Sequence, residues 1–251
     1  MRRFEDQVAI VTGAAHGIGK ATAWRLANEG AAVAVADVDL GAAQQVARAI
    51  CEADGQALPV RVDVSSRQQV AQMLETVVAR YGPVEVLANV AGIVVDAPFL
   101  QVTDQQWQKT LDVNLNGTFL CSQVVARHMV EHKVQGRIVN MASTNGLVGE
   151  EDLVAYNASK FGIVGLTMTM AIELAPYNIR VNSVCPGLIK TRLTAAACAD
   201  PQWAADYLGK IPLNRFGEPE EVAAAVAYLA STDSRFITGH QLVIDGGQLT
   251  F

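Results

Sequence analysis

The strongest constraint on the fold is an alternation of short apolar runs with longer stretches of helical periodicity. Runs of strand character occur at Val8–Thr12, Ala32–Ala36, Leu58–Val62, Val84–Val90, Arg137–Ala142, Ile179–Val184 and Gln241–Ile244. Between them lie the helical patterns Ile18–Glu29, Leu40–Ala53, Ser66–Arg80, Asp104–Val113, Gly117–Lys133, Tyr156–Leu174 and Pro219–Ala230. Continuously apolar strands are typical of parallel sheets buried on both faces. The pattern predicts an α/β fold, a Rossmann-like doubly wound parallel β-sheet flanked by helices on both faces.

The chain contains no linker rich in Pro, Gly or Ser, so we expect a single domain over residues 1–251. Its least regular stretch is Pro186–Gly217. That stretch is too long for an ordinary connection between elements, which is typical of functional loops. We therefore expect a substrate-binding lid within about residues 186–217.

Composition excludes several classes of protein. The formal net charge is −6 and basic residues form no run, which argues against nucleic-acid binding. Apolar stretches such as Val222–Ala230 are too short to span a bilayer, and Met1–Phe4 lacks the apolar region of a signal peptide. We expect a soluble, cytoplasmic protein without membrane contact. The four cysteines have no metal-ligand spacing, so we expect reduced thiols and no metal site.

Three glycines lie between the first predicted strand and the first predicted helix. Gly13 permits a tight turn, Gly17 allows the backbone to approach a pyrophosphate, and Gly19 allows helix and strand to pack closely. The free N–H groups of a helix N-terminus bind phosphate. A glycine cluster alone also fits a plain turn, but its position between strand and helix favours a dinucleotide site that includes His16 and Ile18.

Asp37 ends the second predicted strand, where a carboxylate can accept hydrogen bonds from a ribose diol. Asp39 is better placed to cap the following helix, which leaves Asp37 for the ribose. A carboxylate repels a 2′-phosphate, and His16 offers only a weak compensating cation. Asp37 therefore favours NAD over NADP.

Other strand ends belong to the same expected cofactor edge. Asp63, followed by Val64, could hydrogen-bond an adenine amino group or cap the helix near Ser66. Small residues after the fourth strand would let a cofactor lie against the sheet, because ligands bind beyond the carboxyl ends of parallel strands. They follow Asn89 as Val90, Ala91 and Gly92.

Tyr156 and Lys160 are four residues apart on one predicted helix and therefore share a face. Ser143 follows the fifth strand, at the same sheet edge as Gly13 and Asp37. By itself the Tyr–Lys pair also fits an interfacial tyrosine beside a solvated lysine. In combination, the strand ends and the start of this helix meet where a nicotinamide would lie.

The chain resembles the short-chain dehydrogenase/reductase family over essentially its whole length. The motifs occur in the family's order: Thr12-Gly13-xxx-Gly17-x-Gly19, Asn89-x-Ala91-Gly92, Asn114, Ser143, Tyr156-xxx-Lys160, Pro186-Gly187-xxx-Thr191, Ile237-Thr238-Gly239 and Asp245-Gly246-Gly247. One departure is Val90, where the family often has a second Asn. The resemblance implies a single dinucleotide-binding catalytic domain.

The resemblance also implies roles. Tyr156 exchanges the alcohol proton, Lys160 lowers its pKa and holds the nicotinamide ribose, Ser143 orients the substrate oxygen, and Asn114 anchors a water in a proton relay. The segment that contains Pro186, Gly187, Ile189 and Thr191 clamps the nicotinamide carboxamide. Alternative roles remain open for three of these residues: Ser143 and Thr191 as caps, and Asn114 in a helix bend.

The expected function is an NAD(H)-dependent oxidoreductase that interconverts a secondary alcohol and a ketone. Ile93–Phe99, Thr144–Leu153 and Leu188–Tyr207 would supply a mostly apolar pocket, and an acidic run, Glu150–Asp152, could disfavour anionic substrates. Apolar surface on Gly117–Lys133 and Tyr156–Leu174, together with the resemblance, implies a homotetramer.

Two other functions remain as alternatives. One is an NADPH-dependent 3-oxoacyl (acyl carrier protein) reductase of the same family, against which Asp37 argues. The other is a non-catalytic dinucleotide-binding protein, which would not need Ser143, Tyr156 and Lys160 together.

Overall fold

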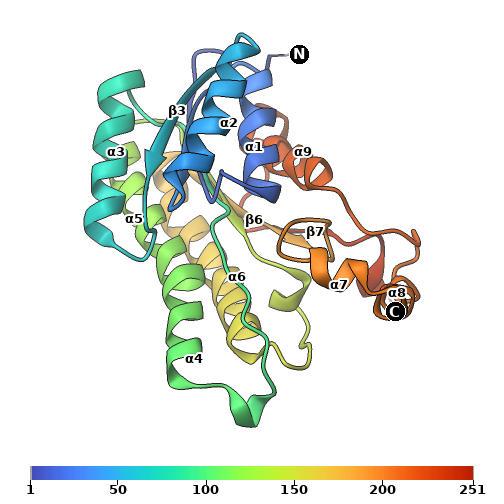
Figure 1. Cartoon of the computed structure of the whole chain (residues 1–251). Helices are drawn as coiled ribbons and strands as arrows, with labels where there is room; N and C mark the ends of the chain where they lie inside the picture. The colour runs from blue at the N-terminus through green and yellow to red at the C-terminus, as the bar shows by residue number, and fades with distance from the viewer. Residues whose placement is uncertain (1, 251) are drawn as a thin grey trace.

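A computed structural model of the chain describes residues 2–250, apart from the side chains of residues 196 and 197. Seven strands form one sheet in the order β3-β2-β1-β4-β5-β6-β7, and every neighbouring pair is parallel (Figure 1). The strands are β1 (Val8–Thr12), β2 (Ala32–Asp37), β3 (Gln56–Arg61), β4 (Val86–Asn89), β5 (Arg137–Met141), β6 (Arg180–Pro186) and β7 (Gln241–Ile244). Each predicted run forms a strand, so the predicted fold class is confirmed.

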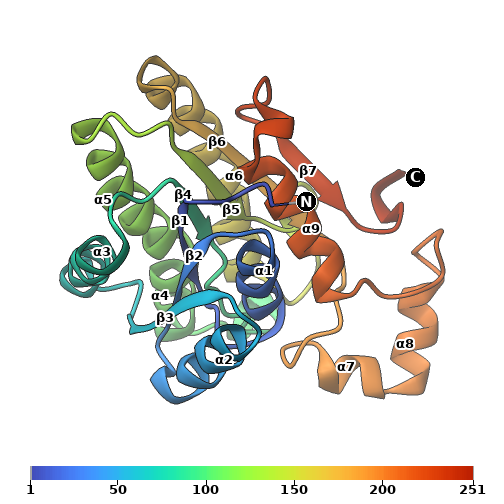
Figure 2. The same ribbon diagram turned by 90° about the horizontal axis from the view of Figure 1, so that it is seen from above.

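Helices cover both faces of this sheet (Figure 2). One apolar core joins it to α1 (Gly17–Asn28), α2 (Leu40–Glu52) and α9 (Pro219–Ala230). The other core joins the opposite face to α3 (Arg67–Tyr81), α5 (Gly117–Glu131) and α6 (Val154–Leu174). Strands β1 and β2 lie in the centre with alternate side chains in each core, which explains why they are apolar throughout.

Two regions depart from the predicted pattern. The helix α4 (Asp104–Leu111) does not stop before α5; a π-helical turn, Asp112–Asn116, joins them. The stretch after β6 contains two short helices that the sequence did not predict, α7 (Ala195–Ala199) and α8 (Pro201–Leu208). Tyr207 at the end of α8 packs with Ile211 and Phe216 in a separate small cluster, beyond the main sheet.

One helical segment among residues 2–250, Val154–Tyr177, is long and apolar enough to cross a membrane by length and composition alone. The same test is passed by core helices of soluble proteins. Here the segment includes α6, which packs against β6.

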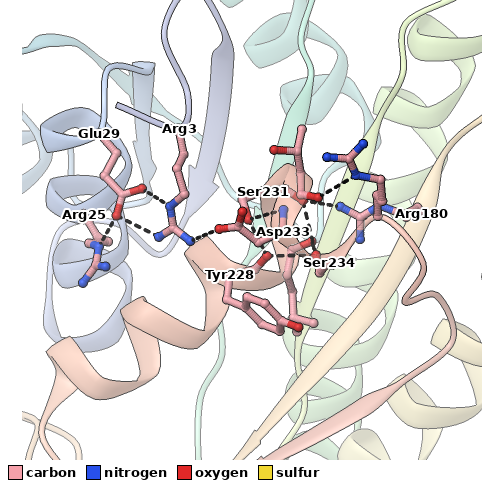
Figure 3. A network of polar contacts seen from close by, with 11 residues as sticks. Arg3, Arg25, Glu29, Arg180, Tyr228, Ser231, Asp233 and Ser234 are labelled. Carbon is pink, nitrogen blue, oxygen red and sulfur yellow. Dashed lines mark hydrogen bonds and ion pairs between the residues drawn. The ribbon is translucent and has the colours of Figure 1, made fainter. Parts of the chain in front are cut away.

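An ion-pair network attaches the N-terminal segment to the rest of the fold (Figure 3). Arg3 bonds both oxygens of Glu29, at 2.6 and 2.9 Å, and also reaches Asp233 at 3.1 Å. Arg25 pairs with the same Glu29. Burial opposes ionisation of Glu29, but the bonds from Arg3 and Arg25 outweigh it and lower the pKa of this carboxyl. The network therefore links α1 to the segment after α9.

Candidate active site

A cavity of about 790 Å³ lies at the carboxyl ends of the strands, around the point where the strand order reverses between β1 and β4. Ligands bind at such a point in doubly wound sheets, and the volume is within the range of cofactor sites. The structure brings most of the predicted site residues into its lining: Gly13, His16, Gly17, Ile18, Gly19, Asp37, Asp63, Val64, Ala91, Gly92, Tyr156, Lys160 and Thr191.

The glycine loop forms a backbone cradle that side chains would fill. Gly13 and Gly17 have φ of +65° and +50°, a conformation that favours glycine. A Cβ on Gly19 would lie 2.0 Å from the carbonyl oxygen of Gly13, and one on Gly13 would lie 2.7 Å from Ala91 Cα. Close approach of bare backbone, followed by the start of α1, fits a pyrophosphate group.

Asp37 lies at the far end of this loop and has a structural role that the sequence did not indicate. Its two carboxylate oxygens accept from the backbone N–H groups of Ala15 and Asp39, both at 3.0 Å. Asp39 caps α2 by accepting from Ala42, as predicted. The His16 ring lies 3.7 Å from the Asp39 carboxylate. When protonated, His16 would therefore face the Asp39 carboxylate as well as any 2′-phosphate.

Asp63 is not the cap of α3. That cap is Ser66, whose hydroxyl accepts from the backbone N–H of Gln69. Asp63 instead accepts from the backbone N–H and the hydroxyl of Ser65, at 3.0 and 2.6 Å. Since it also lines the cavity, the expectation of an adenine contact is the one compatible with this geometry.

Tyr156 and Lys160 face the cavity from the first turns of α6. The Lys160 ammonium is 5.4 Å from the centre of the Tyr156 ring and donates to the Met141 carbonyl oxygen at 2.6 Å. Desolvation lowers the pKa of Lys160 to about 8. Desolvation raises the pKa of Tyr156 to about 12, while a hydrogen bond with Ser143 acts in the opposite direction. Without an added positive charge, the tyrosine is therefore protonated near neutrality.

Ser143 is buried next to these residues, at the end of β5. Its hydroxyl accepts from the backbone N–H of Asn145 at 3.1 Å and caps the short helix Thr144–Gly146. The expected alternative, a capping role, is therefore present. It is compatible with the bond to Tyr156.

Asn114 lies in the π-helical turn, where it is fully buried. Its amide oxygen accepts from Ile93 N at 2.8 Å, and its amide nitrogen donates to Ile93 O and Ser159 Oγ. The side chain thus fixes the segment after Gly92 against α6. The suggestion that Asn114 occupies a helix irregularity is correct.

Besides Ser143 and Asn114, four predicted residues lie outside the cavity lining. Asn89 is buried, and its amide donates to Ser122 and Asn140, so the side chain belongs to the interior. The other three are Pro186, the last residue of β6, and Gly187 and Ile189, which follow it. Thr191 is not a helix cap, because α7 begins only at Ala195.

Two side-chain contacts on the expected substrate side could not be predicted from the sequence. Tyr207 accepts from the Gln248 amide, and Asn145 donates to Glu150 at 2.8 Å. These residues belong to no motif, and the fold creates both contacts.

Together, the sheet and cavity define a dinucleotide-binding α/β protein with an ionisable pair at the ligand. A family model described as "Enoyl-(Acyl carrier protein) reductase" matches residues 13–248. The chain belongs to the short-chain dehydrogenase/reductase family of oxidoreductases, which act on CH–OH and ketone groups and bind a nicotinamide dinucleotide.

Three relatives illustrate the range of proteins that the chain is similar to. A 3-oxoacyl-[acyl-carrier-protein] reductase FabG of Thermotoga maritima is 42% identical, over 98% of each chain. A human (3R)-3-hydroxyacyl-CoA dehydrogenase is 41% identical, over 98% of this chain and 96% of its own. A solved structure of a putative NAD(P) dependent gluconate 5-dehydrogenase from Beutenbergia cavernae, with bound NADP, has a TM-score of 0.94 at 35% identity, over 98% of each chain.

Proposed function

We propose that the protein interconverts a secondary alcohol and a ketone, with Tyr156 as the acid and base. The observation that carries this is the meeting of Tyr156, Lys160 and Ser143 beside the glycine-lined cavity. A bound nicotinamide would supply or accept the hydride. Tyr156 would donate its proton to the carbonyl oxygen, or accept it from the alcohol, and Ser143 would orient that oxygen. Lys160 would favour the phenolate by its positive charge and would hold the nicotinamide ribose.

Supporting residues complete the proposed site. Asn114 would hold a water that links Lys160 to solvent. The segment from Pro186 to Thr191 would bind the carboxamide end of the cofactor, and the remainder up to residue 217 would act as a lid on the substrate. Asn89 would support the cofactor edge from the interior through Ser122 and Asn140.

Exchange of Tyr156 for Phe tests the catalytic assignment. We expect turnover to fall by at least about a thousandfold, within the contribution of acid–base catalysis, while NADH binding stays within about threefold. The probes are ethyl acetoacetate, cyclohexanone and acetoacetyl-CoA, read as absorbance of reduced cofactor. Turnover equal to wild type would refute the role of Tyr156.

The proposed cofactor is NAD, because the Asp37 carboxylate lines the cavity and would repel a 2′-phosphate, and His16 already faces Asp39. Exchange of Asp37 for Asn keeps an acceptor for Ala15 and removes the charge. We expect the NADPH-to-NADH ratio of kcat/KM to rise about tenfold or more, and Asp39→Asn, which frees the His16 ring, to raise it by less. A wild-type preference for NADPH would support the alternative, a 3-oxoacyl (acyl carrier protein) reductase.

The substrate is proposed to be a small alcohol or ketone, and the assembly a homotetramer. Large apolar side chains are exposed along the helices expected to form the interface, including Phe119 of α5 and Phe161, Met168 and Ile172 of α6. Ile172 is 77% exposed in the single chain. Contact with a second copy would remove this apolar surface from water, which is favourable. Light scattering on the eluting protein measures the mass, and a monomer would overturn the assignment.

A further inference from the structure

A buried hydrogen-bond chain continues from Ser143 away from the cofactor cavity. Asn145, only 7% exposed, lies two residues after Ser143. The Ser143 hydroxyl donates to Asn145 Oδ1 at 3.3 Å and accepts from the Asn145 backbone N–H at 3.1 Å. These two bonds restrict both the rotamer and the rotation of the hydroxyl that faces Tyr156.

The other half of the Asn145 amide is held by acceptors. Its Nδ2 donates to Glu150 Oε2 at 2.8 Å and to Asn157 Oδ1 at 3.0 Å. An ionised carboxylate can only accept. If the amide were reversed, its oxygen would face the carboxylate and both groups would lose their bond. Glu150 therefore determines that the oxygen of Asn145 faces Ser143.

The same chain of bonds reaches the helix that carries Tyr156. Asn157 follows Tyr156 directly, and its amide donates to the backbone oxygen of Glu150 at 3.1 Å. The loop after β5 and the first turn of α6 are thus joined by the side chain of Asn157.

We propose that Asn145 is a positioning residue for Ser143, and that Glu150 fixes the orientation of the Asn145 amide. The proposal rests on the proposed function, in which Ser143 contacts the substrate oxygen and Tyr156 exchanges its proton. Asn145 itself acts only through Ser143. This gives Glu150 a role distinct from that of its neighbour Glu151.

The first test removes the amide in the full-length protein. In Asn145→Ala we expect kcat for ethyl acetoacetate with NADH to fall about tenfold, which corresponds to about 1.4 kcal/mol, with KM for NADH unchanged. Asn116 is the matched control, since its amide also donates to a carboxylate, that of Asp112, at 2.8 Å on an exposed surface. Asn116→Ala should retain the wild-type kcat.

The second test needs no substrate and so separates this proposal from the proposed function. Ultraviolet titration of the NAD-saturated protein, with the Tyr156→Phe curve subtracted, reports the pKa of Tyr156. Loss of the fixed Ser143 hydroxyl should raise that pKa in Asn145→Ala. This result is decisive even if wild type reduces none of the probes.

The third test reverses the polarity of the pair. Asn145→Asp alone sets one carboxylate against Glu150 and should lower kcat as Asn145→Ala does. Adding Glu150→Gln restores one donor and one acceptor and should return kcat to within about threefold of wild type. Glu150→Gln in the wild-type background shows whether this exchange raises kcat only when residue 145 is Asp. Glu151→Gln is the control for loss of a neighbouring charge. The proposal would be overturned if Asn145→Ala kept both the wild-type pKa of Tyr156 and the wild-type kcat. It would also be overturned if the double variant had a kcat no higher than that of Asn145→Asp.

Discussion

The buried ammonium of Lys160 makes a quantitative prediction about stability. Burial lowers its pKa from the usual 10.5 to about 8. Each tenfold change in a protonation equilibrium is worth about 1.4 kcal/mol, so the charged amine costs the folded apoprotein about 3 kcal/mol at low pH. Because the unfolded chain binds more protons between pH 8 and 10.5, this cost disappears as the pH rises through that window.

Exchange of Lys160 for Met removes the titrating group and keeps an unbranched side chain of similar length. It also leaves the Met141 carbonyl oxygen without the donor that it has in wild type, a cost that does not vary with pH. The free energies of unfolding of the two proteins therefore also differ by a constant amount. The prediction concerns only how their difference changes with pH. Relative to Lys160→Met, wild type should gain about 1 kcal/mol between pH 7 and pH 9.

The measurement is urea unfolding of both cofactor-free proteins at fixed protein concentration, at half-unit steps from pH 7 to pH 9. The comparison cancels other groups, including Cys121, whose buried thiol has a pKa raised to about 12. Parallel curves of unfolding free energy against pH would show that Lys160 titrates normally in the fold. The assignment of a desolvated amine beside Tyr156 would then be wrong.

Two further predictions concern the cradle and the N-terminal network. Gly19→Ala would bring a Cβ to 2.0 Å from the Gly13 carbonyl oxygen, so it should lower the free energy of unfolding by about 1–3 kcal/mol and abolish the fluorescence enhancement of bound NADH. Gly165→Ala, which has open space at its Cβ, should leave the free energy of unfolding unchanged or raise it. Equal effects of the two exchanges would contradict the cradle. Glu29→Gln should lower the free energy of unfolding by about 1–3 kcal/mol at neutral pH. Since the pKa of Glu29 is lowered in the fold, that difference should shrink below about pH 4.5, as wild type loses the same charge; a pH-independent difference in urea unfolding would argue against it.

The sheet could be predicted from the sequence because strands buried on both faces consist of apolar residues. Val33 and Val35 face one core while Ala34 and Ala36 face the other, so the run has no polar gap. Glycines with positive φ and the four-residue spacing of Tyr156 and Lys160 are equally local signals. These features place the cofactor cavity without any knowledge of the tertiary structure.

Other parts of the site depend on contacts that no local pattern encodes. Asn145 is one polar residue in a loop, and only the approach of Glu150 and Asn157 gives it a partner. The backbone contacts of Asp37 with Ala15 join segments 22 residues apart. Helices as short as α7 are too brief to show a period.

The π-helical turn makes the position of Asn114 depend on the number of residues between α4 and α5. A regular α-helix advances about 100° per residue, so removing Asp112 or Val113 would rotate Asn114 relative to α4 and turn it away from Ile93 and Ser159. Surface loops of the same protein can change length freely, whereas this helix cannot. A relative that keeps every side chain of the site but lacks one position here would have its asparagine on the wrong side of the helix.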